Sequence, residues 1–120
     1  ITAWFSEYVP FPVAVPTLAD WRLEGGRLGE VHHQPAAHLI YDRSGKHVSL
    51  TLFSPQPTDF PAESRTRLND DDFFVSQVGQ QPVILWRIGQ LGYALTTDAD
   101  LSSAELLALA AELTSQLEPE

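Results

Sequence analysis

The chain has 120 residues, no cysteine, and 16 acidic against 7 basic residues, which gives a net charge of −9. This length suits one domain with one core, and the lack of thiols excludes disulfides, thiolate zinc sites, iron–sulfur clusters and cysteine nucleophiles. An acidic surface repels nucleic-acid phosphates and anionic lipid headgroups, so we expect binding to neither. No apolar run approaches the roughly 20 residues of a spanning helix, and no signal-peptide pattern is present.

Residues 1–19 are predicted to form an aromatic and Pro-rich arm ahead of the domain. Trp4, Phe5 and Tyr8 have the spacing of a helical turn, and prolines follow at positions 10, 12 and 16. Because proline lacks a backbone donor and biases its predecessor to extended conformations, the arm is expected to be extended. The aromatic side chains either dock on the domain, as the poor tolerance of exposed aromatic clusters favours, or form a membrane-proximal neck.

Residues 20–97 have the short apolar segments and turn signals of an antiparallel sheet. Glycine-containing turns predict hairpins at Gly25-Gly26, Ser44-Gly45 and Gly89-Gln90. The expected strands are residues 20–24, 27–31, 36–43, 46–53, 73–78, 82–88 and 91–97. Residues 54–72 contain three prolines and an acidic triplet, and they are expected to form a long loop.

The hairpin around Ser44-Gly45 predicts which face of the sheet is buried. Pairing across this turn sets Tyr41 opposite Val48, on a face that is apolar throughout. The other face is wetter, and on it His47 lies opposite Asp42. This pattern is typical of an antiparallel sheet whose core covers one face.

Two further registers follow from the apolar pattern. Leu28 meets Ala37 on the apolar face only if the chain reverses at His32-His33, so we place both histidines at a hairpin tip. Near the end of the sheet, the turn at Gly89-Gln90 sets Trp86 opposite Tyr93.

The C-terminal residues 103–116 have the clearest helical pattern. Ser102 and Glu105 have capping-box spacing, and leucine or alanine at positions 106, 109, 110, 113 and 117 forms one apolar face. The predicted fold is therefore α+β: an antiparallel meander of about six or seven strands with a C-terminal helix packed on one face. Residues 20–120 form its single domain.

No metal or cofactor site is expected. His47 opposite Asp42 offers two ligands at most and is more simply a surface ion pair. His38 is expected opposite Arg27, whose charge disfavours a cation. The triplet Asp70-Asp71-Asp72 lacks the alternating ligands and the glycine of a calcium loop.

The chain is not expected to be an enzyme. Ser49, His47 and Asp42 share a face, but they lie on regular strands with no strained turn to expose a nucleophile and no oxyanion nest. Trp86 and Tyr93 either pack in the core or line a groove for a small ligand.

A series of short motifs runs through residues 4–113. These are Trp4-Phe5 before the Pro-rich arm, Gly25-Gly26-Arg27-Leu28, Pro35-Ala36-Ala37, Leu39-Ile40-Tyr41, His47-Val48-Ser49-Leu50, Trp86, Gly92-Tyr93-Ala94-Leu95, Asp98, Asp100-Leu101 and Ala104-Glu105-Leu106. Their order and spacing resemble the extracytoplasmic C-terminal domain of bacterial membrane-anchored anti-sigma factors, also described as transmembrane transcriptional regulators.

The resemblance implies a longer protein with three parts. A cytoplasmic helical domain, often zinc-binding, would hold an extracytoplasmic-function sigma factor; one spanning helix would lie upstream of Ile1; and this domain would lie in the periplasm, anchored to the inner membrane. The start at Ile1 rather than Met agrees with a piece of such a protein. The family supplies no catalytic residues.

The expected function is to sense or relay an envelope signal, with an envelope protein or a protease as a further partner. Trp4, Phe5 and Tyr8 of the arm are the expected relay. The alternative is a small-ligand or metal-binding envelope module whose groove contains Trp86 and Tyr93.

Overall fold

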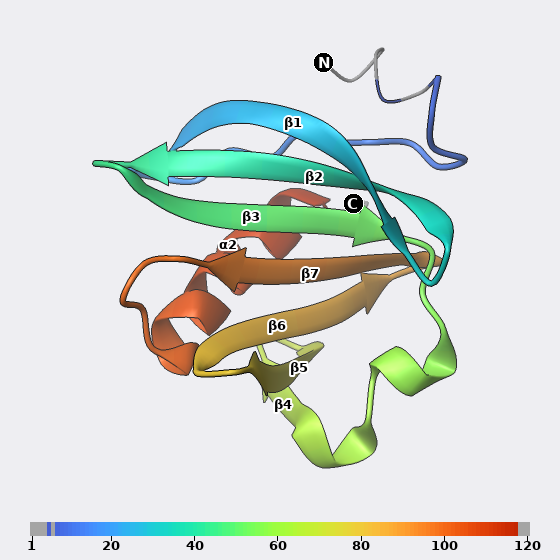
Figure 1. Ribbon diagram of the computed structural model, residues 1–120. Helices are drawn as coiled ribbons and strands as arrows, with labels where there is room; N and C mark the ends of the chain where they lie inside the picture. Colours follow the sequence, from blue (N-terminus) through green and yellow to red (C-terminus); the bar gives the residue numbers. More distant parts are fainter. Residues whose placement is uncertain (1–4, 6, 118–120) are drawn as a thin grey trace.

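The computed structural model describes residue 5 and residues 7–117. It contains a seven-stranded antiparallel sheet and one long helix, which confirms a β-rich α+β fold (Figure 1). The strands are β1 (Arg22–Val31), β2 (Gln34–Arg43), β3 (Lys46–Phe53), β4 (Arg65–Leu68), β5 (Asp71–Val78), β6 (Gln81–Ile88) and β7 (Leu91–Thr97). The helix is α2 (Ser103–Leu117), and the short 3₁₀ helices η1 (Pro57–Asp59) and η2 (Ala62–Ser64) lie between β3 and β4.

The strand order corrects the prediction of a simple meander. In the sheet the order is β1-β2-β3-β7-β6-β5-β4. After β3 the chain crosses to the far edge through η1 and η2, and the second meander then returns strand by strand until β7 pairs with β3 (Figure 1). Hydrophobic patterning along single strands does not encode this crossover, because it depends on which sheet edge the second meander meets.

Three of the predicted hairpin registers are confirmed. Tyr41 pairs with Val48 and Asp42 with His47, and Trp86 pairs with Tyr93. The chain also reverses at His32-His33, whose φ angles of 55° and 63° are those of a primed turn. Leu28 lies opposite Ala37 as predicted, but its side chain is 38% exposed, so it is not part of the core.

The hairpin predicted at Gly25-Gly26 is wrong. Strand β1 continues through both glycines, and its pairing with β2 shifts by one residue between Leu23 and Gly25. The extra residue of this β-bulge is Glu24. Leu23 and Leu28 are five positions apart and would face opposite sides of a regular strand, whereas the bulge lets both face the same side.

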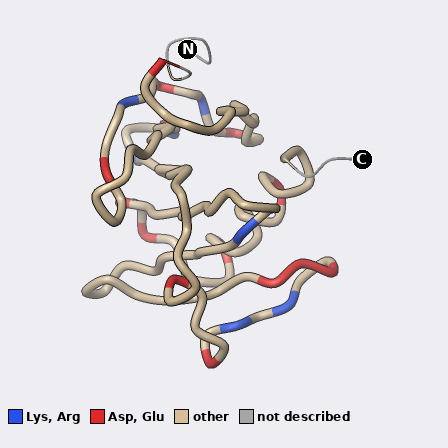
Figure 2. Tube along the Cα trace, turned by 90° about the vertical axis from the view of Figure 1, so that its right-hand side faces the viewer, with Lys and Arg blue, Asp and Glu red and all other residues tan. Residues whose placement is uncertain are grey.

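The long loop predicted for residues 54–72 is partly wrong, because it contains β4 and the first residues of β5. The two strands pair around Asn69 and Asp70, which have φ angles of 54° and 67°. Figure 2 shows the acidic run of this hairpin beside the basic residues of β4, and Arg67 Nη1 donates to Asp72 Oδ1 over 3.0 Å. Strand β4 is short, polar and at the sheet edge, so it has no apolar alternation to mark it.

One face of the sheet is buried beneath α2 and the N-terminal arm. Figure 1 shows α2 running behind the sheet, where it contacts β5, β6 and β7. The arm contributes a set of buried apolar side chains to the same core, namely Phe5, Val9, Val13 and Leu18, and Trp21 follows just after the arm. Inside this core, the Tyr41 hydroxyl donates to the Pro16 carbonyl over 2.5 Å. The arm is therefore part of the folded core.

Helix α2 starts as its sequence predicts. The Glu105 amide donates to Ser102 Oγ over 3.1 Å, and the Ser102 amide donates to Glu105 Oε1 over 3.2 Å, which is a reciprocal capping box. Leu106, Ala110 and Leu113 are fully buried. Within the described residues, no helix is long and apolar enough to cross a membrane.

We expect Leu113→Ala to lower the free energy of unfolding by roughly 2–5 kcal/mol, because it leaves a cavity in a buried site. The same change at the more exposed Leu28 is the control and should cost far less. Chemical denaturation of both variants measures the difference. Equal midpoints for Leu113→Ala and the parent chain would show that α2 does not cover the core.

Candidate functional site

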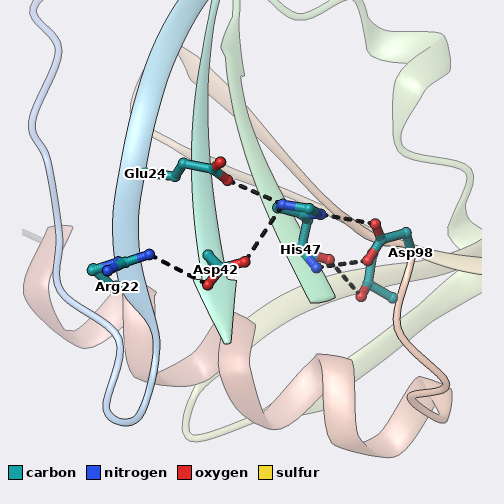
Figure 3. A network of polar contacts seen from close by, with 6 residues as sticks. Arg22, Glu24, Asp42, His47 and Asp98 are labelled. Atoms are coloured by element: carbon teal, nitrogen blue, oxygen red, sulfur yellow. Dashed lines mark hydrogen bonds and ion pairs between the residues drawn. The ribbon is translucent and has the colours of Figure 1, made fainter. Parts of the chain in front are cut away.

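The densest group of ionisable side chains surrounds His47, just after the β2–β3 turn. Figure 3 shows its ring between three carboxylates. His47 Nε2 lies 3.0 Å from Glu24 Oε2 and 3.5 Å from Asp42 Oδ1, and Nδ1 lies 3.0 Å from Asp98 Oδ2. The four residues are called the His47 cluster below.

Four separate elements bring this cluster together. Asp42 faces His47 because the two residues pair across β2 and β3. Glu24 is the extra residue of the β1 bulge, which turns its side chain to the polar face of the sheet. Asp98 follows β7, and the β3–β7 pairing brings it to His47: the His47 amide donates to Asp98 Oδ1 over 2.6 Å, and the Asp98 amide donates to the His47 carbonyl over 3.1 Å.

The carboxylates control the protonation of the ring. The hydrogen bond that the ring donates to Asp98 and the negative charges of Asp98, Glu24 and Asp42 raise the pKa of His47 above its usual value. In turn, hydrogen bonds from the His47 amide and ring lower the pKa of Asp98. Because the His47 side chain is 37% exposed, these ion pairs contribute little stability each.

A cleft of about 610 Å³ lies beside the His47 cluster on the polar face of the sheet. It runs across β1, β2, β3 and β7, and its lining includes three members of the cluster together with Ile40, Ser49 and Thr96; the three are Glu24, His47 and Asp98. Gly25 and Gly26 line the β1 side. A Cβ at Gly25 would meet no atom within 4 Å, so the cleft is open at the bulge.

The two aromatic residues predicted for a ligand groove do come together, but in the core. Trp86 and Tyr93 stack with ring centroids 5.4 Å apart, and their exposed fractions are 1% and 5%. Burial also raises the pKa of Tyr93. Trp86 borders a cleft beside the β4–β5 turn, and Tyr93 borders a different cleft beside Pro10. Neither of these two clefts is lined by both residues.

Of the predicted relay residues, Trp4 lies outside the described residues. Phe5 is fully buried, whereas Tyr8 is 49% exposed. Docking of the arm on the domain, the favoured of the two alternatives, is thus seen at Phe5 and along the apolar residues that follow it.

Ser49 lies on the same face as Asp42 and His47, and it lines the cleft. Both ring nitrogens of His47 face carboxylates rather than this hydroxyl. The arrangement therefore lacks the contact between hydroxyl and imidazole that activates a serine nucleophile.

Two other histidines, His32 and His38, lie away from the His47 cluster. His32 Nε2 lies 2.8 Å from Asp59 Oδ1, a contact that ties the β1–β2 turn to η1. His38 is half-buried, and its Nδ1 lies 2.8 Å from Thr51 Oγ1. Desolvation, with the nearby charge of Arg27, lowers the pKa of His38.

Sequence reasoning found the Asp42–His47 pair but missed Glu24 and Asp98. Asp98 depends on the pairing of β3 with β7, which joins segments far apart in the chain. For Glu24 a signal was available: Leu23 and Leu28 are five positions apart, and they share one face of the sheet only if a bulge lies between them.

Comparison with protein-family models, curated proteins and solved structures finds no match for this chain. The resemblance to anti-sigma factors therefore stays a prediction, and the site has to be interpreted from its own chemistry.

We expect Gly29→Ala to destabilise the domain by about 1–3 kcal/mol. A Cβ at Gly29 would overlap the His38 ring and force it away from Thr51. Gly25→Ala is the matched control on the same strand, since its Cβ enters open space. Urea denaturation compares the two variants, and a loss at Gly25 as large as that at Gly29 would contradict the close packing of His38.

The two histidine rings should titrate in opposite directions from the usual 6.5. We expect an NMR titration to give a pKa above that value for His47 and below it for His38, and Asp98→Asn to lower the pKa of His47 only. The ion pairs of His47 then stabilise the fold fully below pH 6.5, and this contribution is lost as the pH rises through the folded-state pKa. A His47 pKa at or below 6.5 would contradict the geometry of the cluster.

Proposed function

We propose that this domain is the extracytoplasmic sensory part of a membrane-anchored anti-sigma factor, and that its state reaches the membrane through the N-terminal arm. Two observations support the proposal. The ordered motifs of the sequence resemble that family, and the arm is built into the core of the domain. The proposed route of the signal through the arm depends on the second observation.

The arm is held along its length by contacts of different kinds. Phe5, Val9 and Val13 are buried among the apolar side chains of the sheet, and Pro16 accepts the hydrogen bond from the buried hydroxyl of Tyr41. A displacement of the chain before residue 5 would therefore have to disturb the core itself. This gives the domain two energetically distinct states, arm docked and arm released, which a signal can bias.

The end of the arm is fastened to α2 by exposed polar contacts. Gln116 Oε1 accepts from the Thr17 amide over 2.8 Å, and Gln116 Nε2 donates to the Thr17 carbonyl over 2.6 Å. The Ala19 amide donates to Glu112 Oε2 over 3.2 Å. These contacts lie outside the core, so they can be removed without creating a cavity.

In this proposal the sigma factor binds a cytoplasmic domain that precedes the membrane-spanning helix. An envelope protein or a protease acts on the domain described here, either by binding its docked and released states unequally or by removing it. The domain itself performs no catalysis. Prolines at 10, 12 and 16 stiffen the arm, so that a displacement is transmitted rather than absorbed.

The double variant Glu112→Ala/Gln116→Ala in the full-length protein tests this route. Loss of the polar contacts should favour release of the arm and change the basal output of a sigma-dependent reporter by several-fold, while the protein stays folded. Ser115→Ala is the matched control, because Ser115 Oγ contacts the Glu112 carbonyl within α2 and not the arm. The full-length protein should also co-purify with a sigma factor from detergent-solubilised membranes.

Failure to co-purify a sigma factor would remove the assignment to this class of regulator. A different outcome would exclude the arm as the route: the sigma factor co-purifies and the reporter responds to the envelope signal, but the double variant leaves the reporter output unchanged. Proteolytic removal of the domain would then be the better explanation.

A further inference from the structure

We propose that Glu24, Asp42 and His47 bind one divalent transition-metal ion, with Zn²⁺ as the best match, and that Asp98 is the positioning residue for His47. The expectation from the sequence was that no metal site exists, because only the Asp42–His47 pair was apparent. The inference is independent of whether the domain belongs to an anti-sigma factor.

The ligand atoms have the spacing that a metal ion needs. One oxygen each of Glu24 and Asp42 and the Nε2 of His47 all lie within 4.8 Å of one another. The two distances to Nε2 are 3.0 and 3.5 Å. Zinc bonds of about 2.0–2.2 Å set tetrahedral ligands about 3.4 Å apart, so an ion fits between these three atoms with small side-chain adjustments.

The His47 ring is also held in the orientation that a metal ligand needs. Asp98 Oδ1 accepts from the His47 amide and Asp98 Oδ2 lies at Nδ1. This carboxylate fixes the ring orientation and favours the proton on Nδ1, which directs the Nε2 lone pair toward Glu24 and Asp42. Metal-binding histidines are held by such outer carboxylates.

Charge also favours a cation here. With a neutral ring, the Nε2 lone pair would face two carboxylate oxygens, so the space between them holds either the second proton of the ring or a cation, and a divalent cation balances both carboxylates. Arg22 does not fill this place: its Nη2 lies 3.6 Å from Asp42 Oδ2, on the other oxygen of that carboxylate, and its side chain is 80% exposed. The chain's net charge of −9 adds attraction for a cation.

The site is also accessible. His47, Glu24 and Asp98 line the open cleft of about 610 Å³, and Gly25 leaves its β1 side without a side chain. Three protein ligands and an open position resemble the ligand count of zinc sites that keep a water or a small ligand. One imidazole with two carboxylates suits Zn²⁺, Ni²⁺ or Cu²⁺, whereas Mg²⁺ and Ca²⁺ prefer oxygen ligands alone.

Calorimetric titration of the 120-residue chain with ZnCl₂ at neutral pH tests the site. We expect one ion per chain and no binding of Mg²⁺. His47→Gln, Glu24→Gln and Asp42→Asn should each weaken Zn²⁺ binding at least about tenfold, and Asp98→Asn about 10–100-fold through loss of ring positioning. His32→Gln is the matched control, since His32 also contacts a carboxylate, Asp59, but the described part of the chain places no third ligand beside them.

Equal Zn²⁺ affinity in the parent chain and His47→Gln would overturn the proposal, as would loss of binding in the His32→Gln control. Circular dichroism shows whether each variant is folded. If His47→Gln does not fold, NMR of the parent chain decides: Zn²⁺ must shift the ring nitrogens of His47 and leave those of His32 in place. A shift confined to His32, or none at all, rejects the site.

Discussion

The structure depends on burying one face of a seven-stranded sheet that α2 alone does not cover. The helix packs on β5, β6 and β7, so the core residues of β2, including Leu39 and Tyr41, need a second cover. The arm supplies it with its own apolar side chains, and the Pro16 carbonyl satisfies the buried Tyr41 hydroxyl. The two covers are joined where Gln116 contacts Thr17. Because the arm completes the core, its position is coupled to the packing of the domain.

The polar face depends on the bulge in β1. Leu23 packs against the core, whereas Leu28 lies on the same side of the sheet but is 38% exposed. A regular strand would place two residues five positions apart on opposite sides. In the bulge Glu24 lies on the polar side, beside Asp42 and His47. The ligand geometry thus depends on the extra residue in β1, while Asp98 adds the ring orientation from the end of β7.

Local features could be predicted from the sequence, and non-local ones could not. The turn at His32-His33, the Trp86–Tyr93 pair and the Ser102 cap each depend on residues a few positions apart, and all three are confirmed. The pairing of β3 with β7 joins distant segments, and it was missed together with Asp98. Gly25-Gly26 misled the prediction because glycine permits a turn without requiring one. In this strand Gly25 instead leaves open space beside a bulge.

The arm and the His47 cluster meet in the first residues of β1. Trp21 closes the arm: its amide donates to the Leu18 carbonyl, its ring is buried, and the Arg43 guanidinium lies 4.4 Å from the ring centroid. One residue later Arg22 contacts Asp42, and Glu24 follows within the cluster. An ion held by Glu24, Asp42 and His47 would tie this start of β1 to the β2–β3 hairpin. It would therefore brace the sheet at the point where the arm enters it, so that binding at the polar face and docking of the arm on the apolar face act on the same short segment of chain.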